Sequence, residues 1–197
     1  MKHFVVTIGR EFGSKGCAIG TELARQLGVN LYDKDLVEEA AKKLQMDAET
    51  VRSADEVSAK DMEDIATTYG VQNFYISTQV LAAQAEFIEE VADKESCVIM
   101  GRCADYILKD RSDCLKIFIY APFASRVKHI MEEYDLSEFA AKRMVKQTDA
   151  KRDEYYRYVT GISRGEHTGK DLMIDSSLMG VEETVKMIKQ MVEKKFA

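Results

Sequence analysis

The sequence predicts an α/β fold of three layers, in which a mainly parallel five-stranded sheet lies between two layers of helices. Short runs of apolar, strand-forming residues alternate with helical patterns along the chain, at 4–8, 29–32, 96–100, 115–120 and 172–174. The sequence has one proline, Pro122, and therefore no Pro-rich linker, so we expect a single domain over residues 1–197.

Composition narrows the class of protein. Hydrophobic residues make up 46% of the chain and charged residues 31%, and the formal net charge is −6. That charge argues against nucleic acid or an anionic membrane as the partner. No apolar run approaches the roughly 20 residues that span a bilayer, and the chain enters its first strand directly. We therefore expect neither a membrane anchor nor a signal peptide.

The cysteines and histidines show no metal-binding spacing. The cysteines stand at 17, 97, 103 and 114, and the histidines at 3, 129 and 167. Cys97 and Cys114 begin apolar runs, where a free thiol packs as a small hydrophobic group. We therefore expect reduced thiols and a cytoplasmic protein.

The first functional signal is a turn between the first strand and the first helix. Glycines at 9, 13 and 16 allow a tight turn and the close approach of a ligand, because they carry no Cβ. The unpaired N–H groups at the start of the following helix favour an anion, and Lys15 adds a positive charge. Residues 9–17 therefore have the composition of a phosphate-binding loop.

This loop departs from the pattern G-x-x-x-x-G-K-[ST] at two positions. Ser14 stands where the second glycine belongs, and Gly16 stands where a magnesium-binding hydroxyl is expected. The Ser14 hydroxyl could replace that group geometrically. The alternative is a glycine-rich corner that binds nothing.

The region after the first helix predicts a short strand and a helical insertion. Gly28 is expected to cap the first helix, and 29–32 ends at Asp33. Asp33 could meet a magnesium–water cluster or a substrate hydroxyl, could cap a helix at 34–44, or could do both. Residues 34–70 are polar and helical in pattern, and we interpret them as an insertion over the site.

An amphipathic helix is expected over 73–92. Phe74, Leu81 and Ile88 recur there every seven residues. We interpret this stripe as core packing, although the helix could also make a dimer contact. The chain is therefore expected to be a monomer or a homodimer.

The run 96–100 is continuously apolar, as expected of a strand buried on both faces, and it ends at Gly101 and Arg102. A charged residue there lies at the carboxyl edge of the sheet, where open α/β folds bind ligands. Arg102 is therefore a candidate contact for a substrate phosphate or base, or alternatively a partner of Asp105. Right-handed crossovers would place the glycine loop, Asp33 and Arg102 at one edge.

The remaining elements are expected as strands at 115–120 and 172–174 and as helices after Pro122, from near Ser137, and over 181–196. Between them, residues 142–170 hold eight basic and four acidic residues, a net +4 in an acidic chain. Arginines on a closing lid could surround a phosphoryl group and exclude water, so we interpret 142–170 as a basic lid. The alternative is a solvated helix face.

Four blocks of sequence resemble the cytidylate kinase-like family, a branch of the P-loop nucleoside monophosphate kinases. They are 7–14, 32–34, 100–105 and 149–156, and 171–177 extends them, so the resemblance covers nearly the whole chain. It implies a P-loop NTPase-type fold with nucleotides as partners. It also implies transfer of the γ-phosphoryl group of ATP, with Mg²⁺, to a nucleoside monophosphate such as CMP or a related pyrimidine nucleotide.

The resemblance also assigns residues. By similarity, Lys15 and the loop amides would hold the donor phosphates, and Arg152 and Arg126 match lid-side arginines around the transferred group. The expected catalytic residues are Lys15, Arg152 and Arg126, and the expected donor contacts are Gly9, Arg10, Gly13, Ser14, Lys15, Gly16 and Cys17. The expected substrate contacts are Asp33 near the sugar, Arg102 and Asp149, and the expected metal contacts are Ser14 and Asp33.

Two departures from the family pattern leave other functions open. Met100 stands where bacterial cytidylate kinases have an aspartate that helps hold the metal's water shell. Thr148 stands where a lid arginine is expected, and Lys146 supplies charge without the fork of a guanidinium. The alternatives are a kinase of another small metabolite and a non-catalytic nucleotide-binding regulatory protein.

Overall fold

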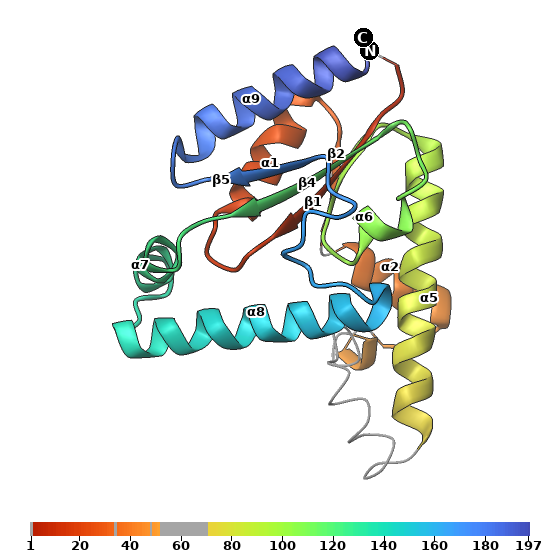
Figure 1. The fold of residues 1–197 in the computed structure, drawn as a ribbon. Coiled ribbons are helices and arrows are strands. Elements are labelled where there is room, and N and C mark those ends of the chain that lie inside the picture. The colour runs from red at the N-terminus through yellow and green to blue at the C-terminus, as the bar shows by residue number, and fades with distance from the viewer. Residues whose placement is uncertain (1, 34, 48, 52–70) are drawn as a thin grey trace.

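The structure is a computed structural model that describes residues 2–33, 35–47, 49–51 and 71–197 (Figure 1). The strands are β1 (Val5–Arg10), β2 (Asn30–Tyr32), β3 (Cys97–Met100), β4 (Cys114–Tyr120) and β5 (Leu172–Asp175). The helices are α1 (Gly16–Leu27), α2 (Asp35–Leu44), α5 (Val71–Lys94), α6 (Ala104–Ile107), α7 (Phe123–Tyr134), α8 (Glu138–Thr160) and α9 (Gly180–Lys195). Each predicted strand is present, with ends within two residues of expectation.

The strands form one sheet in the order β2-β3-β1-β4-β5, and each neighbouring pair is parallel. The predicted three-layer α/β fold is confirmed. Because the carboxyl ends of parallel strands meet at one edge, the segments that follow β1, β2 and β3 lie near one another. This edge carries the glycine loop, Asp33 and Arg102, as the sequence predicts.

Helices cover both faces of the sheet, which explains why its central strands are apolar at consecutive positions. α1 and α9 pack on one face, and α5 and α6 pack on the other (Figure 1). Alternate residues of β1 serve the two sides. Val6 and Ile8 lie in the cluster with α1 and α9, whereas Val5 lies in the cluster with α5.

Helix ends follow local sequence signals, with one correction. Gly28 adopts φ 68° and caps α1 by donating its N–H to carbonyls of the last turn, as predicted. The Ser137 side chain caps α8. Pro122, expected inside the first turn of α7, instead precedes that helix in an extended conformation, because α7 begins at Phe123.

α5 is longer than predicted and packs largely as predicted. Ile88 is fully buried against the sheet, and Leu81 packs against Tyr155 and Tyr156 of α8. The core role of the stripe is thus confirmed for Leu81 and Ile88, while the side chain of Phe74 lies outside the described residues. Of the predicted insertion 34–70, α2 and residues 49–51 are helical, and residues 34, 48 and 52–70 lie outside the described residues.

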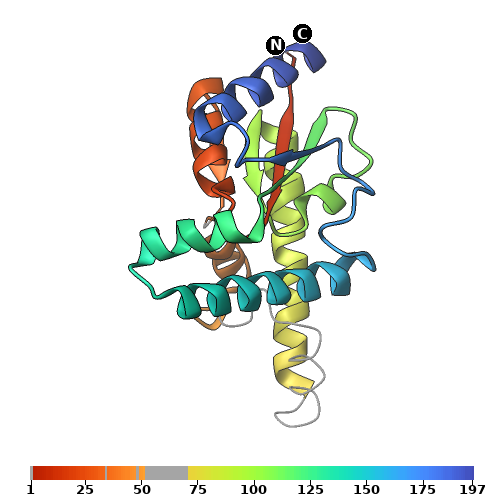
Figure 2. The same cartoon turned by 60° about the vertical axis from the view of Figure 1, so that its left-hand side comes forward.

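α7 and α8 form an antiparallel pair across the carboxyl edge of the sheet (Figure 2). Val127 and Ile130 of α7 pack against Ala141 and Val145 of α8. α8 spans most of the predicted lid. Residues 161–171, which return the chain to β5, have neither helix nor strand.

The cysteines are free thiols, and three of them are buried. Burial raises the pKa of Cys97 to about 12 and that of Cys114 to about 11, so both pack as unreactive small groups, as predicted. Among the described helices, none is long and apolar enough to cross a membrane.

Candidate functional site

The turn between β1 and α1 has the strand–turn–helix geometry expected of a phosphate-binding loop. Gly13 adopts φ 82°, Lys15 adopts φ 60°, and α1 begins at Gly16. The first amides of α1 have no partner within the helix and lie at the carboxyl edge of the sheet, where they would stabilise an anion. The Lys15 side chain is exposed beside them.

Arg10 explains two glycines at this edge. A Cβ on Gly16 would lie 2.6 Å from Arg10 Cβ, and a Cβ on Gly101, which has φ 73°, would lie 2.1 Å from Arg10 Nη1. Arg10 Nη2 lies 3.4 Å from Asp33 Oδ1. The Arg10 guanidinium therefore joins the ends of β1, β2 and β3.

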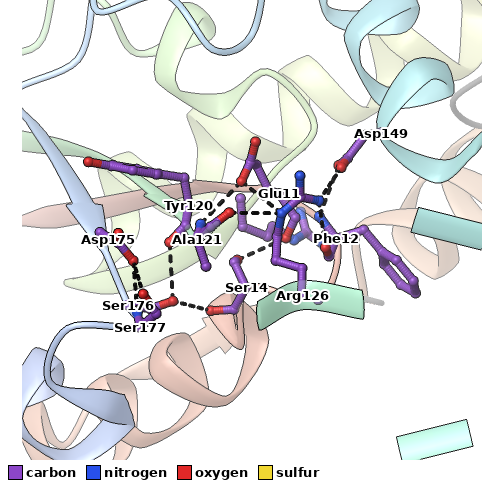
Figure 3. A network of polar contacts seen from close by, with 12 residues as sticks. Glu11, Phe12, Ser14, Tyr120, Ala121, Arg126, Asp149, Asp175, Ser176 and Ser177 are labelled. Carbon is purple, nitrogen blue, oxygen red and sulfur yellow. Dashed lines mark hydrogen bonds and ion pairs between the residues drawn. The ribbon is translucent and has the colours of Figure 1, made fainter. Parts of the chain in front are cut away.

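Four charged side chains connect the loop to its neighbouring segments, and we name them the loop clamp; Figure 3 shows three of them, Glu11, Arg126 and Asp149. The fourth is Arg164. Asp149 Oδ1 accepts the Phe12 N–H at 2.9 Å, and Arg126 Nη1 donates to the Phe12 carbonyl at 3.0 Å. Arg126 also pairs with Asp149 Oδ2 and with Glu11 Oε2. The loop clamp thus ties the loop to α7 and α8.

Hydrogen bonds from Arg164 and Ser176 complete the support of the loop. Arg164, from the segment after α8, donates from Nη1 to the Arg10 carbonyl and from Nη2 to Asp149 Oδ1, both at 2.9 Å. Ser176, after β5, donates from Oγ to the Ser14 carbonyl at 2.6 Å (Figure 3). The Arg10–Ser14 backbone is therefore fixed from both sides.

Three cavities adjoin the loop. The large cavity, about 300 Å³, lies between the loop, α7 and the turn before α9. The loop cavity, about 170 Å³, lies over the start of α1. The arginine cavity, about 30 Å³, is lined by Arg10, Arg102, Arg152 and Arg164 together with Asp105, Phe118, Tyr155 and Tyr156. The loop therefore has room for polar ligands on more than one side.

Most predicted site residues line these cavities. The large cavity is lined by Gly13, Ser14 and Lys15, and the loop cavity by Gly16 and Cys17. The arginine cavity is lined by Gly9 and Arg102. The loop cavity and the arginine cavity are both lined by Arg10 and Arg152. Asp33 joins them through Arg10. The alternative pairing of Arg102 with Asp105 is not observed, because the Asp105 contacts go to Tyr156 and Lys170.

Arg126 and Asp149 lie behind the loop and not among the groups that face the cavities with Arg152. The Arg126 side chain is 8% exposed and bonds to loop backbone. Both Asp149 oxygens bond within the loop clamp. In this conformation, the geometry supports positioning roles for both residues in place of the predicted catalytic and substrate contacts.

The predicted metal contacts fit unequally. Ser14 is 1% exposed and its hydroxyl donates to the Glu11 carbonyl at 2.8 Å, which argues against Ser14 as a metal ligand. Met100 is buried, and its Sδ would lie 2.5 Å from a Cβ on Gly20, so it packs against α1. Asp33 is 32% exposed and fits better. No cluster of three metal-binding side chains occurs in the part of the chain that the structure describes.

Sequence reasoning missed Arg164, Tyr156 and Lys170 as site residues. Arg164 and Lys170 are part of the basic segment, but no spacing relates position 164 to the Arg10 carbonyl, 154 positions away. Tyr156 reads as an ordinary apolar position of a helix. These contacts depend on how residues 161–171 return across the sheet edge, which local patterns do not encode.

Comparison with known proteins gives related sequences. The curated cytidylate kinase of Desulfurococcus amylolyticus is 32% identical over 111 residues, covering 54% of this chain and 57% of the relative. The cytidylate kinase of Methanosarcina mazei is 27% identical over 105 residues, covering 52% and 58%. The chain thus matches little more than half the length of these relatives.

Solved structures match over nearly the full length. An uncharacterized protein from Eubacterium ventriosum has a TM-score of 0.73 at 27% identity, covering 96% of this chain and 98% of that chain. Shikimate kinase from Acinetobacter baumannii has a TM-score of 0.51 at 14% identity, covering 98% and 93%. At that identity the second likeness shows the fold alone, a P-loop-type α/β fold.

The family model described as the cytidylate kinase-like family matches residues 5–178. This range includes the phosphate-binding loop, the arginine cavity, the loop clamp and the turn after β5. The chain belongs to the cytidylate kinase-like family.

Proposed function

We propose that the protein transfers the γ-phosphoryl group of ATP to a nucleoside monophosphate, CMP or a related pyrimidine nucleotide. One observation carries the proposal: the loop cavity and the arginine cavity lie at one sheet edge, and Arg10 and Arg152 line both of them. Family membership and the names of the two curated relatives support it.

In this proposal the two substrates approach the loop from opposite sides. The amides of the loop and of the first turn of α1, with Lys15, bind the donor phosphates, and the large cavity takes the rest of the donor. Arg102 and Arg10, which line the arginine cavity, bind the acceptor phosphate. Arg152 lies between the two and stabilises charge on the transferred group.

Residues 142–170 act as the lid of a single domain that spans residues 1–197. α8 brings Arg152 to the loop, and the loop clamp fixes this arrangement. Mg²⁺ would enter with ATP and neutralise phosphate charge, with Asp33 as the protein oxygen that fits it. The free buried thiols support a cytoplasmic location. We leave open a monomer or a homodimer.

The test is an ADP-release assay with ATP, Mg²⁺ and a panel of acceptors. The panel holds the ribo- and deoxyribonucleoside monophosphates and small hydroxyl metabolites. We expect activity with a pyrimidine nucleotide and a loss of at least 100-fold in kcat/KM for Lys15→Ala. The matched control is Lys142→Ala, at an exposed position of α8. Full activity of Lys15→Ala would refute the role of Lys15.

Two alternatives have specific support. The arginine cavity, at about 30 Å³, favours an acceptor smaller than a nucleotide, which the metabolite arm of the panel would reveal. The buried Met100 in place of an acid favours a non-catalytic nucleotide-binding regulator. That protein would bind ATP in calorimetry and release no ADP with any acceptor.

A further inference from the structure

The arginine cavity contains a carboxylate that the proposed reaction does not yet use. Its described lining brings four arginine residues together with Asp105. Asp105 lies on α6, directly after the turn that carries Arg102, and its side chain is 10% exposed. A carboxylate among arginines would weaken the binding of a simple anion, so its presence calls for a different partner.

Two side chains hold Asp105 from behind. The Tyr156 hydroxyl donates to Asp105 Oδ2 at 2.9 Å, and Lys170 Nζ lies 3.9 Å from the same oxygen. The Lys170 side chain is 1% exposed and lies 5.6 Å and 5.2 Å from the ring centroids of Phe118 and Tyr156. Lys170 Nζ has no hydrogen-bond partner among the described residues.

A buried ammonium of this kind is costly to the fold. Burial lowers the pKa of Lys170, and the charge of Asp105 opposes that effect. Replacing a buried ion pair by apolar side chains is often neutral or stabilising, so stability alone does not explain Lys170. What Lys170 and Tyr156 achieve together is to fix Asp105 through Oδ2. The other oxygen, Oδ1, accepts no hydrogen bond from the described residues, and Asp105 lines the arginine cavity.

We propose that Asp105 selects the phosphoryl acceptor, by accepting at Oδ1 a hydrogen bond from a hydroxyl or amino group of the molecule whose phosphate the arginines bind. This inference deepens the proposed function and rests on it. The ligand class is a phosphate monoester that also carries an O–H or N–H donor. Tyr156 and Lys170 are positioning residues that act through Asp105.

The carboxylate of Asp105 and the volume of the arginine cavity restrict which acceptors can bind. An ionised carboxylate accepts hydrogen bonds and donates none, so it disfavours an acceptor that presents a carbonyl oxygen at the same place. A cavity of about 30 Å³ holds a few atoms, so it takes a polar tip of the acceptor and not a whole base. For a pyrimidine nucleotide, the donor is either the 4-amino group of cytosine or a ribose hydroxyl.

The test compares ratios of kcat/KM for CMP against UMP, 2′-deoxy-CMP and 3′-deoxy-CMP, in the wild-type protein and in Asp105→Asn. If Asp105 binds the amino group, Asp105→Asn reduces the preference for CMP over UMP by about tenfold or more. If it binds a sugar hydroxyl, the preference over the matching deoxynucleotide falls by a similar factor. Ratios that stay within about twofold of wild type in every comparison overturn the proposal.

Further variants separate selection from folding. Asp105→Asn leaves Lys170 buried without a counter-charge, so Asp105→Asn/Lys170→Met carries the same ratio test if the single variant does not fold. Tyr156→Phe should lower the affected ratio several-fold. Tyr158→Phe, an exposed position on the same helix, should leave it unchanged. A lower Tm in Tyr156→Phe with unchanged ratios would make Tyr156 structural only and overturn its positioning role.

Failure of the proposed function would look different. If wild-type protein releases no ADP with any acceptor, the kinase proposal fails, and the same comparisons are then made with Kd values from calorimetry. A wild-type preference among these nucleotides that Asp105→Asn abolishes supports the role of Asp105 in binding. Equal Kd ratios in both proteins overturn it.

Discussion

The two halves of α8 differ in what they touch, although both are rich in charge. In the first half, 138–146, Ala141 and Val145 pack on α7, while Lys142 pairs with Glu138 at the surface. In the second half, Asp149 joins the loop clamp, and Arg152 and the two tyrosines line the arginine cavity. The charged residues of the first half therefore lie on a solvated helix face, which is the alternative interpretation of the basic segment. The lid interpretation applies to the charged residues of the second half.

This difference shows that the net charge of a segment does not identify which of its residues form the site. The basic residues of 142–170 include exposed ones such as Arg143 and nearly buried ones such as Arg164 and Lys170. What separates them is the neighbour that each meets across the sheet edge. Matched substitutions in the two halves of α8 therefore test whether this difference matters for activity and stability.

The largest effect is expected for Asp149→Asn. This change leaves Arg126 and Arg164 facing each other without a shared carboxylate, so the free energy of unfolding should fall by about 3 kcal/mol. The loop would lose its support, and kcat/KM should fall about 100-fold. Denaturant unfolding and the ADP assay measure the two. Glu138→Gln, in the first half, is the control, and equal losses in both variants would contradict the comparison.

A smaller effect is expected for Arg152→Lys. The substitution keeps the charge but removes the fork that lies 5.6 Å from the Phe12 ring centroid. We expect kcat to fall about 10- to 100-fold, with the free energy of unfolding changed by less than about 0.5 kcal/mol. Arg143→Lys provides the same chemical change in the first half, and we expect wild-type kinetics from it.

A pH-dependent effect on stability is expected at Lys170, which packs on Tyr156 of the second half. Its pKa is lowered in the folded state, mainly by burial, so the unfolded chain binds more protons between the folded and the ordinary lysine pKa. Stability should therefore rise with pH through that window. In an Asp105→Asn background, Lys170→Met should raise Tm at neutral pH, and this gain should shrink as the pH approaches about 10.5. Thermal scans across pH measure it, and a gain that does not vary with pH would contradict the assignment.

The smallest effect is expected for Lys142→Ala in the first half. Its pair with Glu138 is an exposed i, i+4 contact, so its loss should lower the free energy of unfolding only slightly, and less at high salt. Unfolding at two ionic strengths tests this. A loss comparable to that of Asp149→Asn would show that the first half carries more than surface charge.

The fold could be predicted from the sequence because its signals are local. Apolar runs, Gly28 and Ser137 each act on their own segment, and parallel strands then bring their carboxyl ends together without further instruction. The loop and Arg102 could be placed for the same reason. The start of α7 differs from the prediction, because Pro122 precedes this helix instead of lying in its first turn.

The site could be predicted only in part because its side chains meet through tertiary contacts. Asp149 was assigned to substrate by resemblance, yet its carboxylate lies between Arg126 and Arg164, which come from different segments. The Ser14 hydroxyl satisfies the Glu11 carbonyl within its own turn. The Lys170–Asp105 pair joins residues 65 positions apart, and no periodicity relates them.

Arg10 changes how glycines in this loop should be understood in related sequences. Gly16 and Gly101 leave space that the protein's own arginine fills, so their small size is tied to residue 10 as much as to a nucleotide. The contact at Gly16 is with the Cβ of residue 10, which every residue except glycine carries, so position 16 should stay small whatever side chain follows β1 there. The contact at Gly101 is with the guanidinium itself, so an arginine at position 10 of a related sequence should be accompanied by glycine at position 101.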